Sequence, residues 1–579
     1  MNLSINQNSD RDYMLDCLWQ LRAYFYYAAI FSASVNLLML TPIIYMLQVY
    51  DRVVSSGSMS TLTMLTIFMI ALLSASGGFE WVRTRLLIAA NVKLEEKLRD
   101  RVSQIAFKST ILTGNPDGSA QAMSDLISFR QFVTGAGVFA IMDAPWVPIY
   151  IIVMFMFHPM FGYAAIITTI ILMALAILTQ RVTGKKLESA NSASRAAQAS
   201  FASNLRNAEV IHGMGMASNI QARDGRLFDQ ACQDVSLASA TNGKLAALSK
   251  SFRQVAQSLL LGLGAYLALT QQISPGMMIA GSLLLGRALA PIDVAVSQWK
   301  SFVSVKASFD RLRKVLKAYG PEAQKMDLPT PSGQLSVENL VVAPPRSNTP
   351  SVRGVNITLS AGEALGIIGP SAAGKTSLAR GILGIWPMLA GTVRLDGAEI
   401  SSWSRQDLGP YLGYLPQDIE LFNGSIADNI ARFTSIDSNK VIEAAKTAGI
   451  HNMILRLPDG YETQIGANSG VLSAGQRQRL GLARAIYDRP KLIVLDEPNS
   501  NLDDQGESDL LSALRKLKES GSTVIVITHR TSVLSLVDKL AILKEGMLTS
   551  FGARDEVLKA LNAAKSKVTK LQNQVTPRN

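Results

Sequence analysis

Long stretches without a charged residue alternate with charge-rich stretches along the first 300 residues. A helix needs about 20 apolar residues to cross the hydrocarbon core of a membrane. The four uncharged runs are residues 23–50, 53–79, 144–180 and 254–286. The first two predict one crossing each, and each of the last two is long enough for two crossings joined at a proline. The pattern predicts six spans, near 23–46, 61–82, 136–157, 160–180, 255–272 and 276–296.

The basic residues between these spans predict the orientation of the chain. Residues 83–135 carry eight Lys and Arg and residues 181–254 carry ten, whereas the three short loops together carry only Arg52. Cytoplasmic loops carry the excess of Lys and Arg in membrane proteins. We therefore expect both termini and both long loops to be cytoplasmic.

The two long loops have the pattern of helices rather than of flexible linkers. Residues 86–107 and 183–248 are rich in Ala, Leu, Glu, Lys and Arg at helical spacing. Each loop contains a break, at Thr113-Gly-Asn-Pro116 and at His212-Gly-Met-Gly215. Helices that leave the membrane, turn and return present their turns to a cytoplasmic partner.

Three charged residues, Asp143, Arg287 and Asp293, fall inside or at the edge of predicted spans. Such groups usually face a cavity or a partner charge. The alternative for Arg287 and Asp293 is a place near a helix end, from which they reach the membrane surface. A cavity-facing role is favoured more for Asp143, which lies deeper in its span.

Composition agrees with a membrane protein and argues against several other classes. Hydrophobic residues make up 48% of the 579 residues and charged residues 17%, against a usual charged fraction of about 25%. The mean hydropathy of +0.20 excludes a disordered chain. The net charge is +12; residues 1–330 carry 29 Lys and Arg against 20 Asp and Glu, and residues 331–579 carry 27 against 24. The positive charge therefore lies mainly beside the spans, which argues against a nucleic-acid surface on the second half.

The second half contains a phosphate-binding loop between a strand and a helix. An apolar strand at 364–368 precedes Gly369-Pro-Ser-Ala-Ala-Gly-Lys-Thr376, and a helix is expected from Ser377. This is the G-x-x-x-x-G-K-[ST] pattern in its required context, in which backbone N–H groups surround the phosphates. Lys375 would neutralise the β- and γ-phosphates, and the Thr376 hydroxyl would bind Mg²⁺. The residues expected to contact ATP here are Gly369, Pro370, Ser371, Ala372, Ala373, Gly374, Lys375, Thr376 and Ser377.

Two further apolar strands end in polar side chains. The four apolar residues 492–495, after Lys491, lead to Asp496 and Glu497, and residues 524–527 lead to Thr528-His529. In parallel α/β sheets, ligands gather at the carboxyl ends of the strands. Asp496 suits an Mg²⁺ ligand, and Glu497 suits a general base that polarises the attacking water.

The segment Leu472-Ser-Ala-Gly-Gln476, followed by Arg477-Gln-Arg479, resembles the signature of ATP-binding cassette (ABC) transporters. The order of the motifs matches that family over residues 336–550. The resemblance implies that Gln417 senses Mg²⁺ and the attacking water, and that His529 holds the γ-phosphate. It also implies a homodimer with two composite sites, in which residues of one cassette meet the ATP of the other or cross the dimer interface: Ser473, Gly475, Gln476 and Asp503.

The implied fold class is a membrane all-α exporter domain of six helices joined to an α/β P-loop ABC nucleotide-binding domain. The expected organisation is a cytoplasmic segment at 1–22, a transmembrane domain at 23–317, a linker at 318–335, the nucleotide-binding domain at 336–560 and a basic tail at 561–579.

Three membrane segments narrow the resemblance to the ATPases of bacterial type I protein secretion, in the branch that exports proteases, lipases and haemophores. They are Tyr45–Arg52, Met142–Pro148 and Gln298–Phe302, and Glu497-Pro-Asn-Ser-Asn-Leu-Asp503 agrees with them. About 22 residues precede the first span, too few for the N-terminal peptidase domain of some relatives. The expected cargo is therefore an unfolded polypeptide with an uncleaved C-terminal signal.

That resemblance also implies partners and a location. An inner-membrane ATP hydrolase of this kind works with a periplasmic membrane-fusion adaptor and a TolC-like outer-membrane channel. ATP binding would close the two cassettes, and the turns near 113–118 and 210–216 would carry the motion into the spans. ATP and Mg²⁺ are the implied cofactors.

Three departures from the family pattern stand out. Residues 339–345 contain no aromatic residue to stack on adenine, Ala474 replaces the usual glycine of the signature, and residues 466–470 lack the acidic residue that often precedes it. We expect Ala474 to distort the signature only modestly, because Ser473 and Gly475 remain.

Three other functions are weighed against protein secretion. A lipid or drug exporter has the same architecture and would show lipid-stimulated ATPase activity without an adaptor. An ABC-type ATPase acting on DNA would need a basic stripe on the cassette. A receptor or scaffold with an inactive cassette is disfavoured because Lys375, Asp496, Glu497 and His529 are all present.

Overall fold

The computed structural model describes residues 12–114, 116–319, 328–466 and 472–561. The chain forms two compact units, a helical unit within residues 1–320 and an α/β unit that follows it and also takes in residues 111–114. The predicted segment 1–22, the linker and the basic tail lie partly or wholly outside the described residues.

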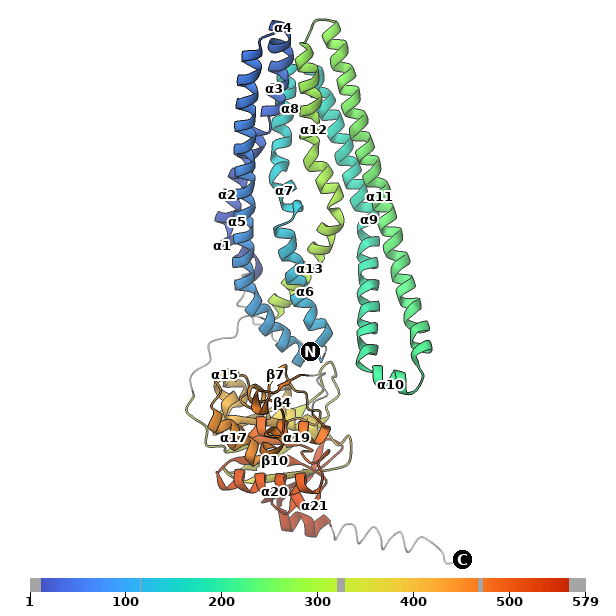
Figure 1. Cartoon of the computed structure of the whole chain (residues 1–579). Helices are drawn as coiled ribbons and strands as arrows, with labels where there is room; N and C mark the ends of the chain where they lie inside the picture. Colours follow the sequence, from blue (N-terminus) through green and yellow to red (C-terminus); the bar gives the residue numbers. More distant parts are fainter. Residues whose placement is uncertain (1–11, 115, 320–327, 467–471, 562–579) are drawn as a thin grey trace, which may run out of the picture. The chain divides into compact units, whose positions relative to one another are not determined.

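Long helices make up the helical unit (Figure 1). They are longer than a membrane is thick because the helical pattern of the spans continues into the charged loops. In chain order the elements are α1 (Tyr13–Gln20), α2 (Arg22–Leu38), α3 (Thr41–Gln48), a π-helical turn (Val49–Val53), α4 (Val54–Ser56), α5 (Met59–Thr113), α6 (Pro116–Val133), α7 (Ala136–Asp143), a 3₁₀ turn (Ala144–Trp146), α8 (Val147–Phe157), α9 (Pro159–Arg206), α10 (Ala208–Gly213), α11 (Ala217–Leu269), α12 (Pro275–Ser297) and α13 (Trp299–Ala318).

Five helical stretches among the described residues are long and apolar enough to cross a membrane: Arg22–Ser56, Met59–Thr113, Gly137–Phe157, Pro159–Arg206 and Pro275–Ser297. The predicted span 255–272 is not one of the five. It falls at the end of α11, which stops at Leu269, so the apolar helix is shortened at one end, and Gln257 interrupts it near the other. The sixth span therefore stays a prediction.

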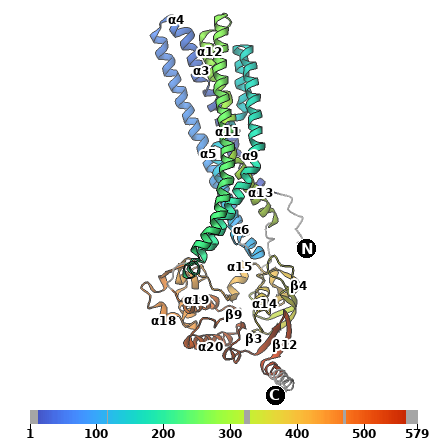
Figure 2. The same ribbon diagram turned by 90° about the vertical axis from the view of Figure 1, so that its right-hand side faces the viewer.

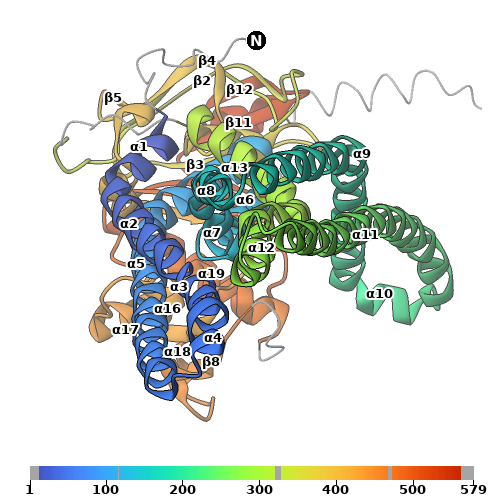
Figure 3. The same ribbon diagram turned by 90° about the horizontal axis from the view of Figure 1, so that it is seen from above.

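The structure confirms the two predicted breaks in the long helices. Gly114 ends α5 with a left-handed backbone (φ +61°), and Gly215 does the same after α10 (φ +65°). Glycine adopts this conformation without the steric cost that a β-carbon brings. The short helix α10 joins α9 to α11, which pack side by side (Figures 2 and 3).

Two apolar clusters hold the helical unit together. One joins α3, α8, α9, α11 and α12 around buried side chains such as Phe161 and Leu284. The other joins α1, α5, α6 and α13 around Met14 and Leu98. The first helix α1 is therefore anchored by its apolar face, although it is not a span.

A buried charged group connects four helices of this unit. Arg83 of α5 is 4% exposed, and its guanidinium lies 3.3 Å from the Asp143 carboxylate at the end of α7. Ser32 and Asn36 of α2 donate to the same carboxylate at 2.5 and 2.7 Å, and the Tyr150 hydroxyl of α8 donates to the Asn36 side chain at 3.0 Å. Asp143 thus binds neighbouring helices, and Arg83 is a buried partner rather than the loop charge that the sequence suggested.

The other two charges in the spans differ from each other. Asp293 of α12 pairs with Arg253 of α11 at 2.7 Å, although the N–H is not directed at the carboxylate. Arg287 is exposed.

The α/β unit is built on a six-stranded sheet with the order β12-β11-β3-β10-β9-β6. The strands β11, β3, β10, β9 and β6 are parallel, and β12 is antiparallel at the edge. Their bounds are β3 (Ala364–Ile368), β6 (Leu412–Leu415), β9 (Leu492–Asp496), β10 (Thr523–Ile527), β11 (Lys539–Lys544) and β12 (Met547–Ala553). All five residues of β9 and of β10 are buried, as expected for parallel strands covered on both faces.

Two smaller sheets and a set of helices complete the described part of this unit. The second sheet has the order β2-β1-β4-β5, and β7 pairs with β8. The bounds are β1 (Leu335–Val342), β2 (Val352–Leu359), β4 (Met388–Leu395), β5 (Ala398–Glu399), β7 (Gly424–Ser425), β8 (Gln464–Ile465), α14 (Lys375–Ile382), α15 (Arg405–Leu408), α16 (Ile426–Ile430), α17 (Ser438–Thr447), α18 (His451–Ile454), α19 (Ala474–Ile486), α20 (Asp504–Glu519) and α21 (Thr531–Leu534), with 3₁₀ turns at Ile400–Ser402, Gly409–Tyr411 and Gly460–Glu462.

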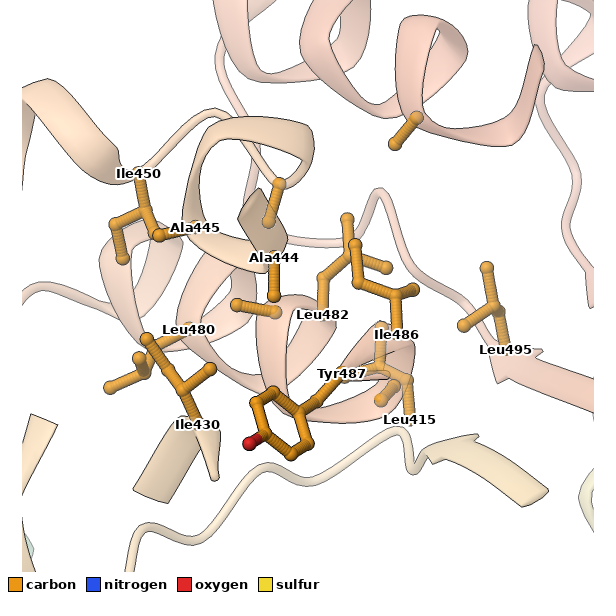
Figure 4. Packing of buried hydrophobic residues seen from close by; sticks show 14 of the residues in the cluster. Leu415, Ile430, Ala444, Ala445, Ile450, Leu480, Leu482, Ile486, Tyr487 and Leu495 are labelled. Atoms are coloured by element: carbon orange, nitrogen blue, oxygen red, sulfur yellow. The ribbon is translucent and has the colours of Figure 1, made fainter. Parts of the chain in front are cut away.

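The apolar core of the α/β unit lies in two parts. In the first, α16, α17 and α19 pack against β6 and β9, and Figure 4 shows Leu480 and Leu482 of α19 among Ile430, Ala444 and Leu495. The second lies between the two larger sheets and α14. The strand ends that carry the candidate chemistry are therefore fixed by buried residues on both sides.

Candidate functional site

The phosphate-binding loop connects the end of β3 to the start of α14. An added β-carbon at Gly369 would lie 2.2 Å from the carbonyl oxygen of Leu543, and one at Gly374 would lie 2.4 Å from that of Ser351. Gly374 also has φ +95°, so both positions require glycine. The helix begins at Lys375 rather than at Ser377 as predicted, because Gly374 caps it in a left-handed conformation.

Lys375 lies inside the curve of this loop. Its side chain is 7% exposed, and Nζ donates to the carbonyl oxygens of Gly369 at 2.8 Å and Pro370 at 3.0 Å. Ser371 and Ala372 form the exposed tip, and Ala373 is buried. A bound phosphate chain would replace neutral carbonyls by anionic partners, which make stronger hydrogen bonds with an ammonium group.

Asp496 ends β9 next to the phosphate-binding loop and is 1% exposed. Among the described residues neither of its carboxylate oxygens has a hydrogen-bond partner. Burial raises the pKa of this carboxyl above its usual range; Glu497 adds to the rise, while Thr376, Arg380 and Lys375 oppose it. The Thr376 hydroxyl thus faces Asp496 without the geometry of a full hydrogen bond.

These residues fit a magnesium ion bound together with a nucleotide. Mg²⁺ prefers oxygen ligands and is usually held by one or two carboxylates with substrate phosphates. The orphaned carboxylate of Asp496 and the Thr376 hydroxyl supply two such ligands. No group of three metal-binding side chains occurs within the described ranges, so phosphate oxygens would have to complete the coordination.

Glu497 lies at the same edge of the sheet in a strained backbone conformation, with φ +49°. Its backbone N–H donates to the carbonyl oxygen of Ile527 in β10 at 2.9 Å. The Gln417 amide, two residues after β6, donates to the Glu497 carboxylate at 3.3 Å. The sheet therefore brings together Gln417 and Glu497, which lie 80 residues apart in the chain.

His529 follows β10 and is exposed, while the preceding Thr528 is fully buried. The Thr528 hydroxyl donates to Asn499 Oδ1 at 3.0 Å and accepts the Arg530 N–H at 3.1 Å. Asn499 belongs to the turn after β9, so this bond links the segments that carry Glu497 and His529. Asn499 lies in the segment 497–503 that the sequence singled out, but its bond to Thr528 could not be known without the order of the strands in the sheet.

The signature segment forms the start of α19. Ser473 caps this helix in a capping box with Gln476: the Gln476 N–H donates to the Ser473 hydroxyl at 3.3 Å, and the Gln476 amide oxygen accepts the Ser473 N–H at 2.8 Å. An added β-carbon at Gly475 would lie 2.6 Å from the carbonyl oxygen of Asn501. Glycine is thus required at 475, and Ala474 is accepted at the exposed first residue of the helix.

Asp503 caps α20 by accepting the Gly506 N–H at 2.9 Å, and it lies 3.6 Å from the Arg479 guanidinium. Within the part of the chain that is described, no hydrogen bond or ion pair joins Ser473, Gly475, Gln476 or Asp503 to residues 369–377. The candidate residues therefore form two separate groups in one chain. Residues 467–470, in the stretch where the sequence lacks the acidic residue that often precedes the signature, lie outside the described residues.

A half-buried arginine that the sequence did not single out connects the strand before Gln417 to α19. Arg432 donates to the carbonyl oxygens of Gly409, Leu412, Arg484 and Ala485 at 2.9–3.0 Å. Burial lowers its pKa to about 10. Its position after α16 carries no motif, so only the fold reveals it.

The sequence matches the patterns of two protein families. Residues 25–290 match "ABC transporter transmembrane region", and residues 352–500 match "ABC transporter".

Individual proteins resemble the chain over almost its whole length. It is 42% identical to the "Type I secretion system ATP-binding protein PrsD" of Rhizobium meliloti, over 96% of each chain. It is 27% identical to the "Cyclolysin secretion/processing ATP-binding protein CyaB" of Bordetella pertussis, over 90% of this chain and 74% of that protein. A solved bacterial Atm1-family ABC exporter with ATP bound shares the fold, with a TM-score of 0.80 and 22% identity over 96% of this chain and 99% of the other.

Proposed function

Because this chain belongs to the ABC transporters, and among them to the ATP-binding proteins of type I secretion systems, we propose that it hydrolyses ATP to export polypeptides. The observation that carries this proposal is the 42% identity to a type I secretion protein over 96% of the chain. The convergence of Lys375, Asp496 and Glu497 at one edge of the sheet supports it. A lipid or drug exporter is the weaker alternative, since the Rhizobium meliloti and Bordetella pertussis relatives described above are both named for secretion.

The hydrolytic step follows from the chemistry of the strand ends. Lys375 and the backbone N–H groups of residues 369–377 bind the phosphates. Thr376 and Asp496 would hold Mg²⁺, with Gln417 nearby, and the bound ion would supply charge neutralisation at the phosphates. Glu497 takes a proton from the attacking water. His529 donates a hydrogen bond to the γ-phosphate.

The remaining candidate residues act in a homodimer. Ser473, Gly475 and Gln476 at the start of α19 lie apart from the phosphate-binding loop of their own chain. A helix N-terminus attracts phosphate, so this one would bind the γ-phosphate of ATP held by the partner cassette, and Asp503 would lie at the dimer interface. Two composite sites result, and each needs both chains.

For the transport step, the chain lies in the bacterial inner membrane, with both termini and the cassette in the cytoplasm. The excess of basic residues in 83–135 and 181–254 supports this orientation. The turns around Gly114 and Gly215 transmit closure of the cassettes to the spans. The exported chain is an unfolded polypeptide with an uncleaved C-terminal signal, and a periplasmic membrane-fusion adaptor and a TolC-like channel complete the path.

The test is ATPase activity of the full-length chain in proteoliposomes, measured with C-terminal fragments of candidate exported proteins. We expect a fragment that carries a secretion signal to change the turnover rate and the same fragment with reversed sequence to have no effect. Co-purification of an adaptor protein would support the same conclusion. A turnover rate that responds to lipid composition and to no fragment would favour the lipid exporter.

A further inference from the structure

Asp51 joins two distant parts of the helical unit. It belongs to the segment Tyr45–Arg52 that the sequence singled out, and it lies in the π-helical turn between α3 and α4. Its Oδ2 atom accepts the Ser274 hydroxyl at 2.5 Å, and its Oδ1 atom accepts the Gly276 N–H at 2.9 Å. Both partners lie at the start of α12, 223 and 225 residues further along the chain. π-Helical turns are rare and often occur at functional sites, and this one places a carboxylate on another helix.

The start of α12 accommodates this carboxylate closely. The Ser274 side chain caps the helix by accepting the Met277 N–H at 3.2 Å, and a negative charge is favourable at a helix N-terminus. An added β-carbon at Gly276 would lie 2.6 Å from Asp51 Oδ1, so a larger residue there would push the carboxylate away. We call the contact of Asp51 with Ser274 and Gly276 the clasp.

The clasp holds a hairpin, made of α2, α3 and α5, that packs weakly against the rest of the chain at this end. Every residue of α5 before Ser76 is at least partly exposed. Among the described residues, the hairpin adds one buried side chain, Ile43, to the apolar cluster shared by α8, α9, α11 and α12. The Tyr45 hydroxyl lies 3.0 Å from the Thr66 hydroxyl and so joins α3 to α5. One segment thus holds the hairpin together through Tyr45 and holds it to α12 through Asp51.

A buried attachment of the hairpin lies far from the clasp. Arg83 of α5 belongs to the buried polar group around Asp143, and about 36 Å of helix separates it from Met59, where α5 begins. The elements on the other side of the clasp are joined more firmly. Besides their apolar cluster, His158 Nε2 lies 3.2 Å from Gln272 Oε1 and joins the turn before α9 to the turn before α12. The hairpin therefore has the arrangement of an arm that turns about Arg83 once the clasp opens.

We propose that the clasp closes the ends of the spans that face away from the long cytoplasmic loops, and that it opens when ATP binds. The hairpin then turns away from α12 and lets the exported chain pass. The inference rests on the proposed function, because it requires that ATP binding moves the spans. A contact that breaks when ATP binds subtracts its free energy from that binding. Loss of the clasp should therefore tighten ATP binding, whereas damage to the fold would weaken it.

The first test is the Kd for ATP of the full-length protein in lipid nanodiscs, in a Glu497→Gln background so that ATP is not consumed. Asp51→Ala removes both acceptor oxygens and should lower the Kd about tenfold. Ser274→Ala removes one donor, and Gly276→Ala displaces the carboxylate; each should lower the Kd about three- to tenfold. Size-exclusion profiles check that each variant folds, and the three variants are independent of one another.

Matched substitutions outside the clasp serve as controls. Asp100 on α5 and Ser56 on α4 are exposed, and an added β-carbon at Gly262 on α11 would contact nothing within 4 Å. Asp100→Ala, Ser56→Ala and Gly262→Ala should leave the Kd for ATP at the value of the Glu497→Gln parent. A fall in Kd that these controls share would contradict the inference, because the effect would not come from the clasp.

The second test locks the clasp with a cleavable thiol cross-linker. Cys17→Ala and Cys232→Ser first remove the two natural cysteines, and Asp51→Cys and Ser274→Cys are then introduced together. The linked chain should bind ATP about tenfold more weakly or worse. With Glu497 intact, it should also protect no labelled polypeptide from external protease in proteoliposomes. Cleavage of the linker should restore both properties.

A second cysteine pair controls for the cross-linker itself. His158→Cys and Gln272→Cys, linked in the same way, join elements on the same side of the clasp. This link should change neither ATP binding nor polypeptide protection. Loss of protection with this pair as well would contradict the inference, because the block would not depend on separation of the hairpin from α12.

The outcomes separate this inference from the proposed function. A Kd for ATP that stays unchanged or rises in all three clasp variants would overturn the inference and leave ATP-driven export intact. A linked clasp that still protects polypeptide at the unlinked rate would do the same. A wild type that protects no polypeptide, while the clasp variants still bind ATP more tightly, would contradict the proposed function and support the clasp.

Discussion

Replacement of Asp496 by asparagine should stabilise the cassette while abolishing its activity. The residue is 1% exposed and both carboxylate oxygens lack hydrogen-bond partners among the described residues, so the ionised form is buried without the hydrogen bonds that would stabilise it. An unsatisfied buried polar group costs about 1–3 kcal/mol. The asparagine side chain would still bury an amide, so we expect a gain near 1 kcal/mol, a fraction of that cost. For a domain of this size that raises the unfolding midpoint by about 2–4 °C.

The pH dependence has a defined sign. Burial raises the pKa of Asp496 in the folded state above its unfolded value, so the folded protein holds more protons between the two values. The contribution of this carboxyl to stability is therefore present below the unfolded pKa and is lost as the pH rises through the folded pKa. The gain from Asp496→Asn should therefore grow as the pH rises through the folded pKa and be smallest in acid.

Thermal unfolding of the full-length protein, followed by a probe of the cassette, measures both effects. Mg²⁺ with ATP at about 100 times its Kd should stabilise the wild type by about 2.7 kcal/mol and Asp496→Asn far less. Asp459→Asn at an exposed position is the matched control and should shift the midpoint little. A lower midpoint for Asp496→Asn without nucleotide would refute the reasoning, because it would mean that the carboxylate has stabilising partners.

Three further substitutions test other parts of the structure. Arg83→Met should destabilise the helical unit by about 3 kcal/mol, because it leaves Asp143 partly buried without its cation; adding Asp143→Leu should recover most of the loss in thermal melts. Gly374→Ala places a β-carbon 2.4 Å from a carbonyl oxygen at φ +95°, a strain of about 1–3 kcal/mol, and should weaken ATP binding about tenfold or more in a titration. Asn499→Ala removes the acceptor of the Thr528 hydroxyl and should lower kcat several-fold with little change in KM, whereas Asn499→Asp, which keeps an oxygen there, should be much less affected.

Local patterns predicted three strands of the six-stranded sheet, β3, β9 and β10, and the long helices of this chain. The apolar strand Ala364–Ile368 has the same first and last residue in the prediction and in the structure. A buried parallel strand is a short apolar run, and here a glycine-rich loop marks its end. The glycines Gly114 and Gly215 marked the helix breaks for a similar local reason. The strand ends that carry Glu497 and Thr528-His529 could be expected at one edge because parallel strands share their direction, whereas the strand before Gln417 was not predicted.

Contacts between distant residues could not be predicted in this way. Arg83 looked like a loop charge because its partners Ser32 and Asp143 lie 51 and 60 residues away in the chain. The bond between Asn499 and Thr528 requires that β9 and β10 be neighbours, which no single motif states.

The most direct test of coupled hydrolysis and export uses proteoliposomes that contain the full-length protein. A labelled polypeptide with a C-terminal secretion signal is added outside the vesicles. ATP hydrolysis is measured for the wild type and for Glu497→Gln. Transport into the vesicle is measured in the same samples as the amount of polypeptide protected from protease added outside. We predict ATP-dependent protection by the wild type, and for Glu497→Gln a loss of turnover with ATP still bound and no protection. Unchanged hydrolysis by Glu497→Gln, or protection of the polypeptide by the wild type without ATP, would contradict the account.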